Sequence, residues 1–146
     1  MSFAIDANVL LYASDTDSSW FAAARRFLDR VCAGTELMIL PWPVLMAYLR
    51  IATHSRVFPH PLTPAQAEAN VDALLSLRHV RAVGEVDGFW RRYREVSEAC
   101  VVRGNAVPDA HVAALLTAHG VAAIYTRDAD FRRYPNLRVL DPFAPA

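Results

Sequence analysis

The segment FAIDANVLLYA (residues 3–13) determines both the fold and the site that we predict from this sequence. Phe3 to Ile5 form a short, unbroken apolar run, which is typical of a strand buried on both faces of a parallel sheet. Asp6 follows at once, and in open α/β sheets the carboxyl ends of the strands form the crevice where ligands bind. The apolar segment after Asn8 predicts a short helix, so either Asp6 or Asn8 could instead serve only to cap that helix.

The rest of the chain alternates short apolar runs with stretches at helical spacing. Further strands are predicted over residues 37–40, 80–83, 121–125 and 137–140. Helices are predicted over about residues 20–34, 43–54, 64–77, 87–103 and 109–120, several of them with a capping residue or a proline at the start. This alternation predicts a three-layer α/β/α sandwich with a mainly parallel sheet, in one domain over residues 1–146.

Composition narrows the classes of function. The chain carries 15 basic and 15 acidic residues, and all 15 basic residues are arginines. This balance argues against broad, non-specific binding to nucleic acid, although guanidinium groups bind phosphate bidentately and stack on bases. Cys32 and Cys100 lack the spacing of a metal site and are expected to be free thiols in a reducing compartment, which favours the cytoplasm. No apolar stretch is long enough to predict a membrane span.

Acidic residues from three separate segments are expected to meet at the carboxyl edge of the sheet. Asp6 leaves the first strand, and Asp128 and Asp130 leave the strand over residues 121–125. Asp109 lies in the first turn of the helix that leads into that strand, and an antiparallel helix begins at the same edge. Carboxylates packed together raise one another's pKa, and a divalent cation such as Mg²⁺ or Mn²⁺ removes that cost. Each acid taken singly could instead stabilise a helix start or form a turn.

Four motifs, in order along the chain, resemble those of PIN-domain ribonucleases and, within them, the VapC toxins of bacterial toxin-antitoxin pairs. The motifs are DANVLLYA from Asp6, LRIATHSRVFPHPLTPAQA from Leu49, RGNAVPDAHVAAL around Asp109 and TRDADFRRYPNLRVLDP around Asp128. The resemblance implies a Mg²⁺- or Mn²⁺-dependent endoribonuclease that cleaves structured RNA, such as tRNA or rRNA loops. It also implies inhibition by a VapB-type antitoxin, whose C-terminal segment lies in the active-site groove, and usually a homodimer.

The resemblance assigns roles residue by residue. Asp6 and Asp109 match the family's metal ligands, while Asp128 and Asp130 match the acidic pair after the late strand. We expect all four to be catalytic and Asp128 to be a third metal ligand. Unpaired bases in RNA loops are recognised by stacking and by contacts to their edges. The residues that we expect to line the approach of RNA are Arg50, Thr53, His54 and Arg127.

One catalytic member of the family's pattern is missing. The family has a glutamate in the helix before LRIATH, and Ala47 stands at that position. Either this chain is a naturally weakened nuclease, or the glutamate was replaced deliberately so that a toxic protein could be made in quantity; we favour the second. The alternative function is a catalytically inactive PIN-like module that binds RNA or an antitoxin.

Two other enzyme classes fit the sequence less well. A phosphoacceptor receiver domain also gathers acids at this edge of a parallel sheet, but it uses a lysine, and this chain has none. A haloacid-dehalogenase-like phosphatase needs an aspartate where Asn8 stands.

Large apolar residues on two of the predicted helices exceed what one small core readily absorbs. They are Trp20, Phe21, Phe27, Trp42, Leu45 and Tyr48. We expect part of this surface to bind an antitoxin helix.

Overall fold

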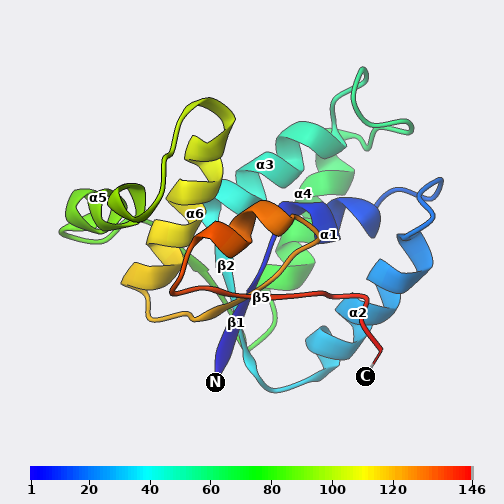
Figure 1. The fold of residues 1–146 in the computed structure, drawn as a ribbon. Coiled ribbons are helices and arrows are strands. Elements are labelled where there is room, and N and C mark those ends of the chain that lie inside the picture. Colours follow the sequence, from blue (N-terminus) through cyan, green and yellow to red (C-terminus); the bar gives the residue numbers. More distant parts are fainter. Residues whose placement is uncertain (146) are drawn as a thin grey trace.

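Five parallel strands form a single sheet at the centre of the molecule, seen in a computed structural model that describes residues 1–145 (Figure 1). The strands are β1 (Ser2–Ile5), β2 (Leu37–Pro41), β3 (Val80–Val83), β4 (Ala123–Tyr125) and β5 (Arg138–Leu140), in the order β3-β2-β1-β4-β5. β1 is central, and Ala4 pairs with Ile39 of β2 on one side and with Ile124 of β4 on the other. The prediction of a mainly parallel sheet is confirmed, because every strand pair is parallel.

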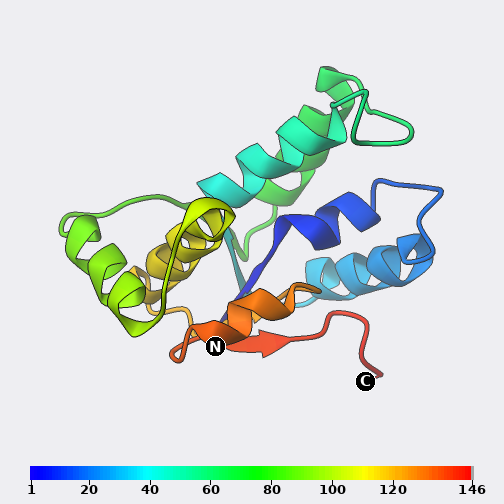
Figure 2. The ribbon, with the colours of Figure 1, turned by 45° about the horizontal axis from the view of Figure 1, so that its top comes forward.

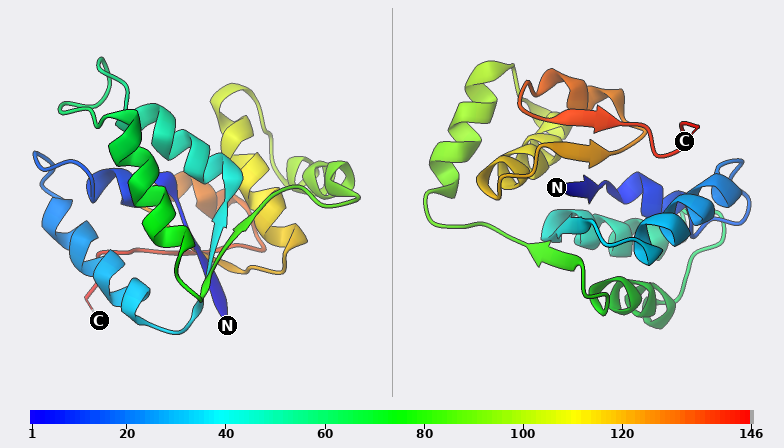
Figure 3. Two further views of the ribbon diagram at one scale, coloured as in Figure 1. Left: turned by 180° about the vertical axis from the view of Figure 1, so that it is seen from behind. Right: turned by 90° about the horizontal axis from the view of Figure 1, so that it is seen from below.

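Helices cover both faces of this sheet. They are α1 (Ala7–Tyr12), α2 (Phe21–Ala33), α3 (Trp42–Ala52), α4 (Pro64–Leu75), α5 (Phe89–Ala99) and α6 (Val107–Ala118), with short 3₁₀ helices η1 (Gly104–Ala106) and η2 (Ala129–Arg133). Figure 2 shows α1 and α2 on one side of the molecule and α5 and α6 on the other. Seen from below, the strands run between these two groups of helices (Figure 3, right). The molecule is therefore the predicted three-layer α/β/α sandwich.

Alternation along β1 divides the apolar core into two clusters. Phe3 and Ile5 pack with residues of α1, α2, α3 and α4, whereas Ala4 packs with residues of α6 and η2. Successive side chains of a strand point to opposite faces, so a strand covered on both faces needs an unbroken apolar run. α3 contributes Leu45 to the first cluster and Val44 to the second. Because α3 also begins directly after β2, it lies along the carboxyl edge of the sheet and joins the two layers.

Most element boundaries predicted from the sequence agree with the structure to within two residues, but one helix is shorter. The helix predicted over residues 87–103 is α5, which ends at Ala99, and Cys100 adopts an extended conformation. No residue of α5 is buried, so the core does not stabilise a further turn. None of the helices formed by residues 1–145 is long and apolar enough to cross a lipid bilayer.

Candidate metal centre

Acidic side chains from two strand ends and one helix start meet at the carboxyl edge of the sheet. Asp6 directly follows β1, Asp128 and Asp130 follow β4, and Asp109 occupies the first turn of α6. β1 and β4 are neighbours in the sheet, so the segments that leave them are adjacent. Carboxylate oxygens of Asp109, Asp128 and Asp130 lie within 4.8 Å of one another. We call these three residues the carboxylate trio.

Asp6 lies beside the trio and is held there by three hydrogen bonds, the longest of them from the side-chain amide of Asn8 at 3.5 Å. One of its carboxylate oxygens accepts from the backbone N–H of Ala7 at 2.7 Å, so Asp6 does cap α1. The other oxygen accepts from the hydroxyl of Thr126 at 2.8 Å. Asp6 is nevertheless close enough to Asp109 for its charge to raise the pKa of that residue. The capping role and a role in the site are therefore compatible.

Thr126 belongs to this site, although sequence reasoning missed it. Its side chain is buried, with 3% of the residue exposed. The hydroxyl donates to Asp6, and it accepts from the backbone N–H of Asp128 at 2.9 Å and from the side-chain amide of Asn8 at 3.1 Å. These bonds tie the end of β1 to the end of β4. The signal in the sequence was a hydroxyl residue directly after an apolar strand and two residues before an acid.

A local turn fixes the spacing of two members of the trio. Oδ1 of Asp128 accepts from the backbone N–H of Asp130 at 2.9 Å, which opens η2. This is the turn-forming role that the sequence left open for Asp128. Arg133 lies on the other side of Asp130, with its Nη2 atom 4.0 Å from the carboxylate, so the ion pair is a long one.

Burial and mutual repulsion disfavour the charged forms of these acids. The pKa of Asp109 is raised from the ordinary value of 3.8 to about 6. Burial of the carboxyl group is the main cause, and the charges of Asp128, Asp6 and Asp130 add to it, while Arg133 acts in the opposite direction. Burial also raises the pKa of Asp6. The chain's own cations therefore leave much of the negative charge of this site uncompensated.

This set of donors fits a hard divalent cation. Carboxylate oxygens are the ligands that Mg²⁺ and Mn²⁺ prefer, and a cation among the trio would offset the repulsion that raises the pKa of Asp109. The trio differs in one member from the ligands expected from the sequence, which were Asp6, Asp109 and Asp128. Hydrogen bonds to its oxygens do not exclude Asp6 from binding the ion, since Oδ1 of Asp128 also accepts one, so Asp6 remains a predicted ligand.

Ala47 lies at the rim of the site. It packs against the second core cluster, which also contains Ala7 and Ala110, the chain neighbours of Asp6 and Asp109. α3 begins at the carboxyl edge, and the prediction that position 47 faces the acids rests on the family resemblance. The described part of α3 contributes no carboxylate to the site.

Only one of the four residues expected to line the approach of RNA directly adjoins the acids. Arg127 follows Thr126 in the chain, and its guanidinium pairs with Asp141 at 2.9 Å. The hydroxyl of Thr53 and the ring of His54 instead bond to backbone groups near the end of α3, and Arg50 is exposed in its last turn. Among residues 1–145, no hydrogen bond or ion pair joins these three side chains to the acids.

The chain matches the family model of the PIN domain over residues 3–137. It is 42% identical over 144 residues to Ribonuclease VapC48 of Mycobacterium tuberculosis, and the match covers 99% of each chain. It is 33% identical over 138 residues to Ribonuclease VapC43 of the same organism, covering 94% of this chain and 93% of the relative.

Solved structures of VapC proteins share the fold. VapC20 of Mycobacterium tuberculosis, a Sarcin-Ricin loop cleaving toxin, superposes with a TM-score of 0.67 at 17% identity, covering 93% of this chain and 98% of that one. VapBC2 of Rickettsia felis, solved with a DNA fragment from its promoter, gives a TM-score of 0.68 at 17% identity, covering 97% and 98%. At these identities the structures establish the fold, and the sequence matches establish the family. This chain therefore belongs to the PIN-domain family and, within it, to the VapC ribonucleases.

Proposed function

We propose that this chain is a divalent-metal-dependent endoribonuclease that cleaves loops of structured RNA, such as tRNA or rRNA, in the cytoplasm. The observation that carries the proposal is the carboxylate trio, whose oxygens lie within 4.8 Å of one another beside Asp6. Further support comes from the similarity to named ribonucleases over nearly the whole length of the chain. One neighbour in fold is a toxin that cleaves the Sarcin-Ricin loop, which is an RNA loop of the class proposed here.

In this proposal Asp6, Asp109 and Asp128 hold a Mg²⁺ or Mn²⁺ ion, with Asp130 beside them. When bound, the ion supplies activation of a water molecule and stabilisation of the charge that develops on the phosphate. The chain's own hydrogen bonds position the ligands. Thr126 fixes the orientation of Asp6, and the turn at Asp128 fixes the position of Asp130. Such preorganisation matters because a ligand group that is displaced by about 1 Å can lower a rate by roughly 100-fold.

Cleavage of a pool of structured RNAs tests the proposal. We expect cleavage in Mg²⁺ or Mn²⁺ and none in EDTA. Asp109→Asn removes a charge from the trio and should lower the rate by roughly 100-fold or more. Asp72→Asn is the matched control, because it removes an exposed carboxylate from α4, and it should cleave at the rate of the unmodified chain. Equal rates in the two variants, or cleavage in EDTA, would contradict the assignment of the metal site.

Ala47 supports a second candidate function. Since α3 supplies no carboxylate to the site, the alternative is a catalytically inactive PIN-like module that binds RNA or an antitoxin. The same experiment separates the two functions. RNA that is bound but not cut in either metal would favour the module, whereas metal-dependent cleavage would favour the enzyme.

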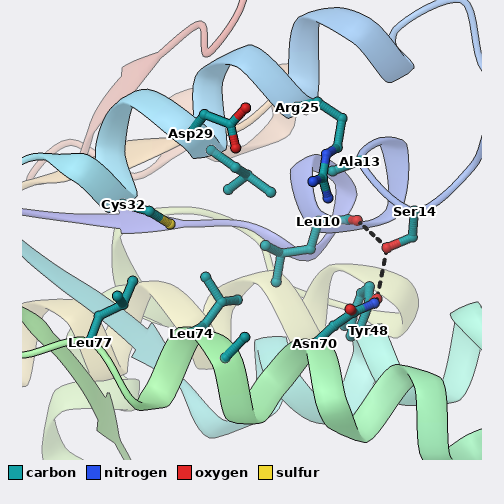
Figure 4. A pocket seen from close by; sticks show the side chains of 12 residues that line it. Leu10, Ala13, Ser14, Arg25, Asp29, Cys32, Tyr48, Asn70, Leu74 and Leu77 are labelled. Carbon is teal, nitrogen blue, oxygen red and sulfur yellow. Dashed lines mark hydrogen bonds between the residues drawn. The ribbon is translucent and has the colours of Figure 1, made fainter.

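We also propose that a VapB-type antitoxin inhibits this chain, and an open groove between α2 and α4 is where we expect it to dock (Figure 4). The groove has a volume of about 310 Å³. Leu28 and Cys32 line it from α2, and Leu74 and Leu77 line it from the side of α4. An apolar groove between two helices is a common docking site for an amphipathic helix. Neighbours in fold that were solved as VapBC assemblies, such as VapBC2 of Rickettsia felis, add support.

Three of the large apolar residues that were expected to exceed what the core absorbs are buried in it. Phe27, Leu45 and Tyr48 are 1%, 0% and 2% exposed and belong to the first core cluster. They point toward the sheet, and the core absorbs more large side chains than the sequence suggested. Trp20 and Trp42 do remain exposed, at 37% and 44%.

A further inference from the structure

A small cluster of surface residues beside the acids has no part in the proposed metal site. Its members are Trp20 at the start of α2, Arg127 after β4 and Phe143 near the C-terminus. The guanidinium carbon of Arg127 lies 4.3 Å from the ring centre of Trp20 and 5.5 Å from that of Phe143. The rings of Trp20 and Phe143 are stacked, with centres 5.0 Å apart and planes inclined by 15°.

These distances place Arg127 and Phe143 on the same side of the indole ring. Arg127 lies 4.3 Å from Trp20 and 5.5 Å from Phe143, whereas two groups on opposite faces of Trp20 would lie much farther from each other than either lies from the indole. Within residues 1–145, no other ring or guanidinium packs on Trp20, and 37% of the residue is exposed. The exposed part of the indole is therefore available to a planar group from outside the chain.

The cluster is joined to the acid site through Arg127. The guanidinium of Arg127 donates to Asp141 at 2.9 Å, and its backbone N–H donates to the side chain of Asn8 at 3.5 Å. Arg127 is also the residue between Thr126 and Asp128, and adjacent Cα atoms are about 3.8 Å apart. The indole platform is thus connected to the carboxylate trio through a single residue.

We infer that the exposed part of the Trp20 indole is a stacking subsite for an unpaired RNA base next to the phosphate that is cut, and that Arg127 contacts the phosphate or the base edge beside it. The inference rests on the proposed function and assigns a substrate contact to it. Aromatic faces stack with single-stranded bases, and a guanidinium can bind phosphate bidentately. The Arg127 guanidinium is paired with Asp141, so a phosphate that binds it would share or replace that carboxylate.

The fluorescence of Trp20 tests the inference directly. The chain has three tryptophans, and the double variant Trp42→Phe/Trp90→Phe leaves Trp20 as the only one. We expect an unstructured oligoribonucleotide, added in EDTA so that no cleavage occurs, to quench this fluorescence in a saturable way. Absence of quenching would overturn the inference. Quenching by a VapB-type antitoxin but not by RNA would also overturn it and would assign the indole to the protein partner.

Affinity for the same oligoribonucleotide gives a second readout. Trp20→Ala should weaken binding by roughly 5- to 150-fold, the range expected for one stacked base. Trp90→Ala is the matched control, because Trp90 is 66% exposed on α5, and it should leave the affinity unchanged. Trp20→Tyr retains an aromatic face and should restore most of the affinity.

The two measurements also separate this inference from a merely structural role of the cluster. Trp20 and Arg127 hold the C-terminal segment through Phe143 and Asp141. If Trp20→Ala lowered the melting temperature but bound RNA as tightly as Trp90→Ala, the cluster would only stabilise the C-terminal segment. The inference would then be wrong. Failure of the proposed function would give a different result. RNA would still bind at Trp20, but it would not be cleaved in Mg²⁺ or Mn²⁺.

Discussion

At the scale of single residues, local sequence predicts the acids of the site but not the residue that connects them. Asp6 and Asp128 could be identified because each follows an apolar strand, and Asp109 because it begins a helix. Thr126 bonds to Asp6 across 120 positions of sequence, so its role depends on the pairing of β1 with β4. Asp130 joins the trio through a turn whose direction the sequence does not specify.

The raised pKa of Asp109 makes stability depend on pH in a defined direction. Its pKa is about 6 in the folded chain and near the ordinary value of 3.8 in the unfolded chain. Between these values the folded state binds a proton that the unfolded state lacks, so stability is highest below about pH 4 and is lost as the pH rises through 6. Asp109 is partly exposed, and solvent screening reduces the effect to roughly 1 kcal/mol, or about 2–4 °C in melting temperature.

Thermal unfolding at pH 5 and pH 8, with and without Mn²⁺, measures this effect. The melting temperature of the unmodified chain should be lower at pH 8 than at pH 5. Asp109→Asn should remove most of this difference, whereas Asp72→Asn should not. Mn²⁺ should raise the melting temperature at pH 8 more than at pH 5, because protonated carboxyl groups bind the ion poorly. A pH dependence identical in Asp109→Asn and the unmodified chain would show that this carboxyl group is not responsible.

At the scale of elements, apolar runs and helix signals predicted every strand and every α-helix, because these signals are local, but not the two 3₁₀ helices. At α4, for example, Thr63 accepts from the backbone N–H of Gln66 while the Gln66 side chain accepts from Thr63 in return. The end of α5 was not predictable in the same way. The amphipathic pattern continues past Ala99, but whether a further turn finds a surface to pack on depends on tertiary structure.

The position of α3 leads to a prediction about Ala47. Because α3 begins at the carboxyl edge and Ala47 packs against the same apolar cluster that contains Ala7 and Ala110, we predict that a glutamate at position 47 would place a carboxylate near the acids. Ala47→Glu should raise the rate of RNA cleavage in Mg²⁺ or Mn²⁺ by roughly 10²- to 10⁴-fold, the contribution of a positioned general base. The rate is compared on the same pool of structured RNAs, with EDTA and Asp6→Asn as tests for a contaminating nuclease.

A neighbouring residue provides the control for this prediction. Met46 is on the same helix and is 50% exposed, so Met46→Glu adds the same charge one position away without facing the acids. It should leave the rate unchanged. Equal rates in Ala47→Glu and the unmodified chain would show that position 47 is not the missing catalytic position, and that the chain either works with its aspartates alone or does not cut RNA.

At the scale of the whole molecule, the groove proposed to receive an antitoxin helix is separate from the acids, where the family resemblance places the antitoxin's C-terminal segment. The acids lie where β1, β4 and α6 meet, whereas the apolar groove lies between α2 and α4. The strand order β3-β2-β1-β4-β5, which sequence patterns do not specify, produces this separation by placing β4 beside β1. A substitution in the groove should therefore change binding of the antitoxin without changing the chemistry at the acids.

Ala73→Arg is the substitution that tests this separation. Ala73 is exposed on α4 and lines the groove, so an arginine there would fill part of the apolar space without disturbing the core. Overpacking of this kind should weaken binding of the cognate VapB-type antitoxin by roughly 5- to 150-fold, measured by calorimetry, and leave RNA cleavage by the free chain unchanged. Ala69→Arg is the matched control, because Ala69 is exposed one turn earlier on α4 and does not line the groove. If the antitoxin bound both variants equally well, the docking site would have to be sought on another face of the molecule.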